Sequence, residues 1–173
     1  LAENKGVTLV VIGMLNNICG LLKSEGDDIS TLSGKELIVH SVESMYVMGG
    51  NFKDFTHGEY NIACDVKSAR YIAENFPAPI VYCGFELGVD VITGKKLYSV
   101  PENHPVRKAY TLWGNTDDMQ RSSWDPITVY CAVERENDMF EASKAVKITF
   151  DDNACAVVAA DGKDRYMIAQ KDD

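Results

Sequence analysis

The sequence lacks the patterns that assign a chain most directly to a class. It has no run of about 18 apolar residues, so no segment is expected to span a membrane. No G-x-G-x-x-G motif follows an apolar run, which argues against a dinucleotide-binding domain. Basic residues are scarce, since 17 lysines and arginines stand against 26 aspartates and glutamates, and the net charge is −9. This balance argues against a nucleic-acid partner and favours a small polar ligand, with or without a metal cation.

Cysteine pairs are absent as well. No cysteine belongs to a C-x-x-C motif, and an odd number cannot form a complete set of disulfides. We predict small buried thiols in a reducing compartment, which favours the cytoplasm, although a signal segment upstream of Leu1 would change that expectation. The cysteines are Cys19, Cys64, Cys83, Cys131 and Cys155.

The length and composition fit one domain, residues 1–173, with a substantial core, because 46% of the residues are hydrophobic. Three short apolar runs, residues 7–12, 44–48 and 80–83, have the pattern of strands buried on both faces. Segments with helical spacing of apolar residues lie between them. We therefore predict an α/β fold whose mainly parallel, Rossmann-like sheet is flanked by helices, with these runs as adjacent central strands.

The C-terminal region is predicted to be an antiparallel β ribbon. Residues 145–150, 155–160 and 166–169 have the composition of strands. Asp161 and Gly162, between the last two, are typical of a tight hairpin turn. The ribbon should lie to one side of the parallel sheet, and it carries no residues that suggest chemistry.

The residues with most chemical potential follow the second apolar run. Gly49 and Gly50 allow a sharp turn and a ligand close to the backbone. A predicted loop then contains Asn51, Glu59 and Asn61. We expect Glu59 and Asn61 to have no structural role, such as capping or packing, in this loop. These side chains can bind vicinal hydroxyls, because a carboxylate accepts hydrogen bonds while an amide both donates and accepts them. Loops after parallel strands are the usual ligand site in an open α/β sheet.

Two aspartates mark predicted helix starts. Asp65 precedes apolar residues at helical spacing and is predicted to be an N-cap. Asp125 and Pro126 form the usual N-cap and N1 combination, so the local pattern predicts a cap there too. Trp124 comes just before them, and its large apolar face suits either packing under the helix or contact with a ligand.

Several of these segments resemble one known family. The motifs M-G-G at residues 48–50 and E-Y-N-I-A-C-D at residues 59–65 are similar to those of the inosine-uridine-preferring nucleoside hydrolases. The order also matches for G-F-E-L at residues 84–87 and W-D-P at residues 124–126. The family has G-P-L-T-N where this chain has G-M-L-N-N at residues 13–17.

The resemblance implies hydrolysis of the N-glycosidic bond of a nucleoside, assisted by a bound Ca²⁺ ion. Three positions would bind the ribose hydroxyls, one would stack on a purine base, and two would bind calcium through a carboxylate and a main-chain carbonyl. No residue of the chain is matched to a catalytic acid or base. An asparagine pair capping a helix is the alternative for the carbonyl position. The matched positions are Asn51, Glu59 and Asn61 for ribose, Trp124 for the base, and Asp125 and Asn16 for calcium.

One family motif has no counterpart in this sequence. The D-x-D-x-x-x-D-D strand of the family supplies most calcium ligands and activates the water, and no such motif occurs here. The chain therefore resembles the larger, C-terminal part of a member. We expect it to pair with a further N-terminal segment or to form a homo-oligomer. The alternative function is a non-catalytic binding or interaction protein, or an inactive fragment, of the same family.

Overall fold

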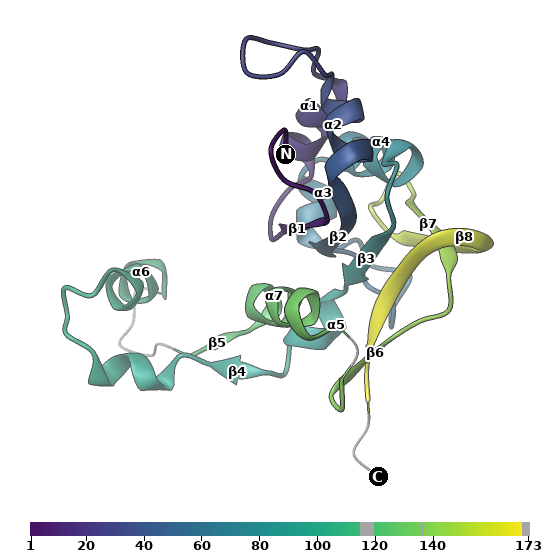
Figure 1. Cartoon of the computed structure of the whole chain (residues 1–173). Coiled ribbons are helices and arrows are strands. Elements are labelled where there is room, and N and C mark those ends of the chain that lie inside the picture. The colour runs from purple at the N-terminus through teal and green to yellow at the C-terminus, as the bar shows by residue number, and fades with distance from the viewer. Residues whose placement is uncertain (115–119, 136, 171–173) are drawn as a thin grey trace.

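The centre of the fold is a parallel arrangement of three strands, seen in a computed structural model (Figure 1). β1 (Val7–Val11), β2 (Val42–Met48) and β3 (Ile80–Cys83) are adjacent and pair in parallel, as the apolar runs predict. The mixed α/β fold with a largely parallel sheet is confirmed. The structure describes the whole chain except residues 115–119, 136 and 171–173.

The position of β1 differs from the prediction. Within the described residues β1 pairs only with β2, so it forms an edge of the sheet instead of a central strand. Val10 is 38% exposed and Ile12, just beyond the strand, is 47% exposed. An apolar run reports which side chains can be buried, but not whether a neighbouring strand is present. β1 therefore presents an open hydrogen-bonding edge.

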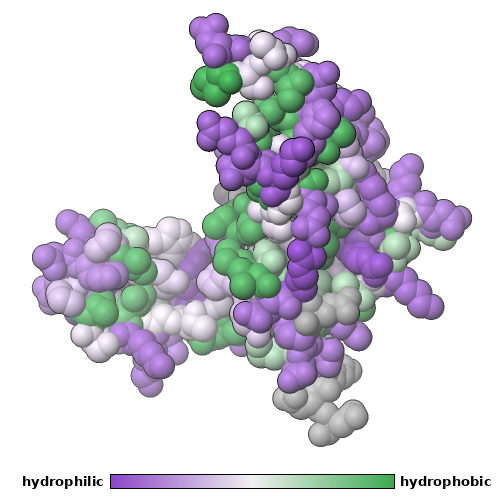
Figure 2. All heavy atoms as spheres, in the orientation of Figure 1, coloured by the Kyte–Doolittle hydropathy of each residue, from purple (hydrophilic) through white to green (hydrophobic). Residues whose placement is uncertain are grey.

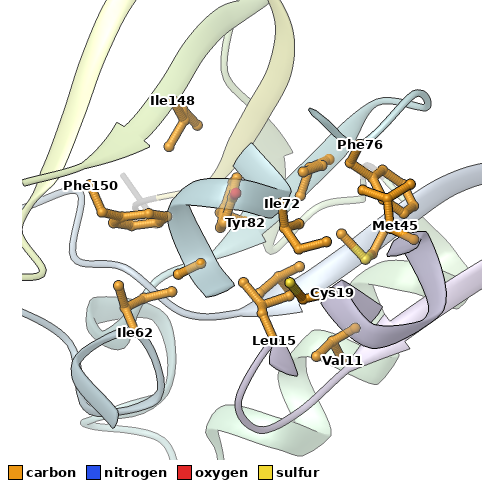
Figure 3. Packing of buried hydrophobic residues seen from close by; sticks show 14 of the residues in the cluster. Val11, Leu15, Cys19, Met45, Ile62, Ile72, Phe76, Tyr82, Ile148 and Phe150 are labelled. Atoms are coloured by element: carbon orange, nitrogen blue, oxygen red, sulfur yellow. The ribbon is translucent and has the colours of Figure 1, made fainter. Parts of the chain in front are cut away.

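Helices cover one face of the sheet and form the larger core. Met45 and Val47 of β2 point to this face, where they join residues of α1 (Asn16–Lys23), α2 (Gly34–Ser41) and α4 (Val66–Asn75). Tyr46, which lies between them, points to the opposite face, as the two-residue period of a strand requires. Figure 3 shows this packing, in which side chains from helices and strands interdigitate.

Side-chain caps fix where two of these helices begin. The Ser33 hydroxyl and the Glu36 carboxylate form a reciprocal capping box at α2. Asp65 accepts a hydrogen bond from the Ser68 amide at 3.1 Å and so caps α4. The predicted role of Asp65 is confirmed.

The opposite face of the sheet packs against α7 (Trp124–Glu134). Ile127 and Cys131 of α7 contact the smaller core cluster, to which Tyr46 of β2 belongs. The Cys83 and Cys131 thiols hydrogen-bond to each other, which ties α7 to the end of β3. All five cysteines are free thiols, as predicted, but one of them is exposed and these two are in contact.

The C-terminal strands form the predicted antiparallel ribbon, but with a different turn. β7 (Val146–Phe150) pairs antiparallel with β8 (Ala156–Ala169), which also pairs with β3 in parallel and with β6 (Phe140–Ala142) antiparallel. β8 continues through Asp161 and Gly162, so the predicted hairpin there is wrong. The β7–β8 register shifts at this point, and a Cβ on Gly162 would lie 2.1 Å from a β7 carbonyl oxygen. The two residues therefore lie in a bulge, in which residues 160–163 of β8 have no register partner in β7.

An extended segment, which we call the arm, leaves the sheet between β3 and α7. It consists of β4 (Ile92–Thr93), the 3₁₀ helix η1 (Lys95–Ser99), α6 (Pro105–Gly114) and β5 (Arg121–Ser122). Figure 1 shows it extending away from the sheet, and Figure 2 shows hydrophobic surface on the arm and where it meets the rest of the chain. Over the described residues, helices are too short or too polar to cross a bilayer.

Tyr82 provides a test of the core packing. Its ring is fully buried between Phe52 and Phe150, at centroid distances of 6.0 and 5.7 Å, and its hydroxyl has no hydrogen-bond partner among the described residues. We expect Tyr82→Phe to raise the free energy of unfolding by about 1–3 kcal/mol, because an unpaired buried hydroxyl costs that much. Tyr82→Ala should lower it by about 3–5 kcal/mol. Urea unfolding measures both, and a marked loss of stability in Tyr82→Phe would contradict the unpaired hydroxyl.

Candidate functional site

The candidate site is organised by the segment that leaves β2. The Gly49 amide donates to the Cys83 carbonyl at 3.1 Å, and the Phe85 amide donates to the Gly50 carbonyl at 2.9 Å. Gly50 has a φ of +85°, and a Cβ there would lie 2.9 Å from the Phe52 ring. Only glycine suits this position. The carboxyl ends of β2 and β3 are thereby tied together.

Glu59 has a structural role that the sequence did not predict. It is the N-cap of a short helix, α3 (Tyr60–Cys64), and accepts hydrogen bonds from the Asn61 and Ile62 amides at 3.0 and 3.2 Å. Burial raises the pKa of Glu59, while hydrogen bonds from these amides and from the Gly50 amide act in the opposite direction. The predicted loop therefore contains the start of a helix. The buried Glu59 carboxylate at this start is only partly compensated by hydrogen bonds for its loss of solvent.

Asn61 fixes α3 against the end of β2. Its side-chain amide donates to the Met48 carbonyl oxygen at 3.1 Å. The amide oxygen of Asn61 remains available as an acceptor. The earlier assumption that Glu59 and Asn61 have no structural role is therefore wrong, although a carboxylate with two oxygens can cap a helix and still accept further hydrogen bonds.

Asp125 is not the cap that its local pattern predicts. α7 begins at Trp124, its N-cap is Ser123 and the Ser123 side chain makes no capping bond. Asp125 lies in the first turn of the helix, where a negative charge is favourable. Burial raises the pKa of Asp125 and the positive charge of Arg121 lowers it. The carboxylate makes no hydrogen bond or ion pair with the other described residues, so its oxygens are free for a ligand.

Trp124 is held in one orientation by Phe85. The indole N–H donates to the Phe85 carbonyl at 2.8 Å, and the two rings stack with centroids 5.4 Å apart. Gly88 of α5 (Phe85–Gly88) allows this approach, because a Cβ there would lie 2.6 Å from the Trp124 Cα. Trp124 therefore presents a fixed aromatic face.

Four of the six predicted site residues line one cavity of about 510 Å³ at the carboxyl ends of the parallel strands, namely Glu59, Asn61, Trp124 and Asp125. The volume falls within the range of small-molecule sites, about 300–1,000 Å³. Glu59 and Asp125 share this cavity although a long stretch of sequence separates them. Other residues that line the cavity are Ile12, Met48, Phe85, Tyr110, Trp113 and Arg121.

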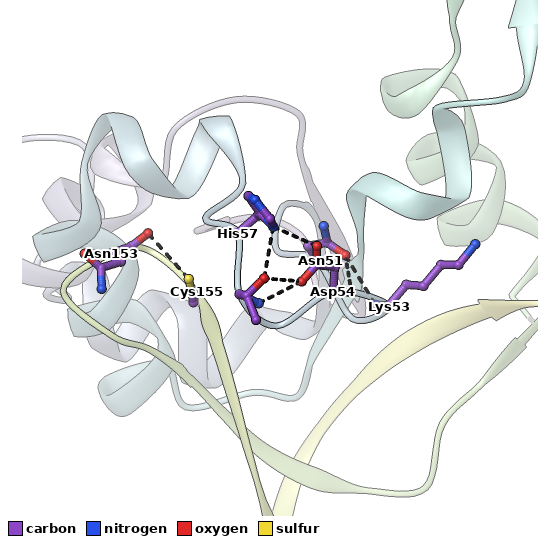
Figure 4. Close-up of polar contacts among 7 residues, drawn as sticks. Asn51, Lys53, Asp54, His57, Asn153 and Cys155 are labelled. Carbon is purple, nitrogen blue, oxygen red and sulfur yellow. Dashed lines mark hydrogen bonds and ion pairs between the residues drawn. The ribbon is translucent and has the colours of Figure 1, made fainter.

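The other two predicted residues lie elsewhere. Asn16 is the first residue of α1, and its side chain accepts a hydrogen bond from the next amide at 3.0 Å. Asn51 stabilises its own loop, where its oxygen accepts from the Lys53 and Asp54 amides at 3.2 and 2.8 Å (Figure 4). In the same loop Asp54 contacts the His57 ring at 2.7 Å. Neither asparagine lines the cavity.

The described residues do not offer a complete calcium shell. No group of three or more histidine, cysteine, aspartate or glutamate side chains comes together among them, and Asp125 and Glu59 are the carboxylates that line the cavity. Because Ca²⁺ takes about six to eight oxygen ligands, the residues present do not fit the ion by themselves.

Sequence reasoning missed the aromatic and cationic part of the cavity. Phe85, Trp113 and Arg121 come from α5, α6 and β5, and each of these elements is short or exposed. The one available signal was the position of Arg121 close to Trp124 in the sequence. No periodicity predicts that the arm folds back to place these side chains together.

Comparison with known proteins gives a consistent result. The family model described as inosine-uridine preferring nucleoside hydrolase matches residues 1–167. The crystal structure of such a hydrolase from Bacillus anthracis is similar, with a TM-score of 0.58 and 14% identity over 97% of this chain and 56% of that chain. A plant nucleoside hydrolase has a TM-score of 0.57 and 18% identity, over 95% of this chain and 57% of that chain. No curated protein sequence matches.

Because both identities are low, these two similarities show that the fold is shared and no more. This chain spans just over half the length of each of the two solved structures.

Glu59 gives a test of the local structure. At pH 7, Glu59→Gln should keep or raise the free energy of unfolding, because the amide oxygen can still cap α3 while the cost of a buried charge disappears. Glu59→Ala removes the acceptor and should lower it by about 0.5–2 kcal/mol. Urea unfolding of both variants at pH 7 measures the difference.

The pH dependence follows from the direction of the pKa shift. Since burial raises the pKa of Glu59 above its ordinary value of 4.5, the folded state binds this proton more tightly than the unfolded state. The resulting stabilisation is complete below pH 4.5 and is lost as the pH rises through the folded-state pKa. The stability of the wild type relative to Glu59→Gln should therefore rise as the pH falls from 7 to 4.5, and a flat profile would contradict the burial of this carboxylate.

Proposed function

The chain belongs to the inosine-uridine preferring nucleoside hydrolase family, and from this premise we propose that the protein hydrolyses the N-glycosidic bond of purine ribonucleosides. Residues 1–173 would hold the ribose and the base. The observation that supports this proposal is the shared cavity, which brings Glu59, Asn61, Trp124 and Asp125 together from two distant parts of the sequence.

The ribose end of the proposed site consists of Glu59 and Asn61. Glu59 uses its oxygens to cap α3, but each carboxylate oxygen can accept more than one hydrogen bond. The side-chain N–H of Asn61 donates to the Met48 carbonyl oxygen, and its side-chain oxygen remains available as an acceptor. Two acceptors side by side suit the donated protons of vicinal ribose hydroxyls.

The charges of the cavity suit the proposed reaction. In hydrolysis the bond from C1′ to the base nitrogen breaks, its electron pair leaves with the base, and water attacks C1′. Positive charge then develops on the ribose. The Glu59 and Asp125 carboxylates line the same cavity and would stabilise this charge more than they stabilise the neutral nucleoside.

Calcium is proposed as the metal of the complete protein, with Asp125 as a ligand from this chain. A bound ion would supply an activated water. The remaining carboxylates would have to come from outside residues 1–173, since the described residues do not form the shell. Asn16 does not line the cavity, so the structure gives no support for its carbonyl as a calcium ligand. No step of the chemistry above therefore depends on the ion.

The open edge of β1 supports a further partner for this chain. Val10 and Ile12 are exposed there, and Ile12 lines the cavity. We propose that a segment outside residues 1–173, or a second copy of the chain, covers this edge. Such a partner would also close the cavity on the side of β1.

Substrate choice tests the role of Trp124. Purine nucleosides should be preferred over uridine, because purines present the larger surface for stacking on the indole. Trp124→Ala should lower kcat/KM for inosine by about 10–100-fold, from stacking worth about 1–3 kcal/mol, with a smaller effect on uridine. Trp124→Phe keeps an aromatic face and serves as the matched control.

Steady-state kinetics of the full-length protein on inosine, guanosine and uridine would measure these effects. Equal kcat/KM for purines and uridine, unchanged in Trp124→Ala, would leave Trp124 as a packing residue. Nucleoside binding without hydrolysis would favour the non-catalytic relative instead.

Calcium binding tests Asp125. In the full-length protein, Asp125→Ala should weaken calcium binding about tenfold or more, because it removes a charged ligand from the shell. Asp28→Ala, at an exposed loop position, is the matched control and should not change the affinity. Isothermal titration calorimetry measures both, and unchanged affinity in Asp125→Ala would remove Asp125 from the shell.

A further inference from the structure

The cavity contains a ladder of planar side chains from four elements. Phe85 of α5 stacks on Trp124 of α7 with centroids 5.4 Å apart. The Arg121 guanidinium of β5 lies 3.5 Å from the centroid of the Trp113 ring of α6, and 5.8 Å from that of Trp124. All four side chains line the cavity. The close contact on Trp113 is a cation–π interaction that fixes the position of the guanidinium.

Arg121 differs from the other arginines of the described chain in how it uses its N–H groups. Arg70, Arg107, Arg135 and Arg165 each donate to a main-chain carbonyl or a carboxylate. Arg121 makes no such bond to the described residues; its guanidinium lies over the Trp113 and Trp124 rings, and its charge acts on Asp125. Stacking occupies the faces of a guanidinium, whereas its N–H bonds lie in its plane and stay free to donate.

Two other donors near Trp124 are already used. The Trp124 indole N–H donates to the Phe85 carbonyl, and the Ser122 hydroxyl donates to the Val89 carbonyl at 2.8 Å. Trp124 therefore offers a base its flat face but no hydrogen bond. A base that stacks there must have its edge recognised by another group, and Arg121 supplies a positively charged donor fork within the same cavity.

We propose that Arg121 determines the preference among purines by donating to O6 and N7 of a 6-oxopurine base. A guanidinium fork matches this adjacent pair of acceptors. Adenine presents an amino group, a donor, in place of O6 and leaves one N–H of the fork unpaired. This inference rests on the proposed nucleoside hydrolase function and adds a residue that recognises the base.

The same contact would assist the departure of the base. When the C1′–N9 bond breaks, the electron pair moves onto the purine, whose N7 and O6 share the negative charge. Arg121 stabilises this charge by hydrogen bonding, and it transfers no proton because a guanidinium stays protonated in proteins. Water supplies the hydroxyl at C1′ and the proton that the base finally receives.

Binding of non-hydrolysable bases to the full-length protein tests the proposal directly. The chain has two tryptophans, Trp113 and Trp124, and both line the cavity, so quenching of tryptophan fluorescence reports occupancy. The probes are 9-methylhypoxanthine, 9-methyladenine and 9-methyl-7-deazahypoxanthine, the last of which lacks N7. The first should bind about 10–100-fold more tightly than the other two, the range expected for loss of one bidentate contact.

Two variants distinguish the bidentate hydrogen bonding of Arg121 from its positive charge. Arg121→Met keeps the length of the side chain, and Arg121→Lys keeps its charge but loses the bidentate geometry. Both should bind all three probes with similar affinity, so that removal of N7 no longer matters. Circular dichroism confirms that each variant is folded, which is expected because Arg121 lies in the two-residue strand β5 of the arm.

The outcomes distinguish this inference from the proposed function. Equal binding of the three probes by the wild type, or discrimination retained in both variants, overturns the role of Arg121 and leaves the base site standing. Failure of every probe to bind overturns both the role of Arg121 and the base site of the proposed function.

Discussion

The structure depends on the way the ends of β2 and β3 are tied together through Gly49, Gly50 and Phe85. The two main-chain bonds there extend the parallel ladder past the last residue of each strand. From this point hydrogen bonds lead to both sides of the cavity. The Gly50 amide bonds to Glu59 at the start of α3, and the Phe85 carbonyl accepts the indole N–H of Trp124 at the start of α7. A side chain at Gly50 would collide with the Phe52 ring and would be strained at the φ of +85° found there.

The sequence predicted the parts of the fold that depend on local composition. The three parallel strands appeared as continuous apolar runs, the pattern of strands buried on both faces, although only β2 and β3 are largely buried. Whether a strand is central or at an edge depends on its neighbours, and the open edge of β1 was therefore not predicted. Asp161 and Gly162 also carry a strong local turn signal. Pairing of the long strand β8 with β3 and β7 overrides it, so the two residues lie in a bulge instead.

The candidate site shows the same limit at its helix starts. Glu59 caps a helix that its sequence pattern did not indicate, because contact between Asn61 and β2 determines where α3 begins. The Asp125–Pro126 pair predicted a helix start two residues too late, since α7 begins at Trp124 with Ser123 as its N-cap. The Ser123 amide donates to the Gly88 carbonyl at 3.2 Å, and this tertiary contact moves the start of α7 to Trp124. The shift removes Asp125 from the cap position and leaves its carboxylate exposed in the cavity. Placement of Arg121 on Trp113 depends on the folding of the whole arm, and no local pattern encodes it.

The cavity combines charges of both signs in a way that fits the proposed chemistry. Breaking an N-glycosidic bond separates charge, because the ribose becomes positive as the base becomes negative. The Glu59 and Asp125 carboxylates are complementary to the positive ribose, and the Arg121 guanidinium is complementary to the negative base. All three side chains line one cavity. Arg121 does not neutralise Asp125 in a close ion pair, since its guanidinium stacks on Trp113 instead. Within the described residues each charged group therefore keeps part of its hydrogen-bonding capacity for a ligand. A cavity that holds opposite charges apart interacts weakly with a neutral nucleoside and strongly with its charge-separated transition state, which is the condition for catalysis rather than tight substrate binding.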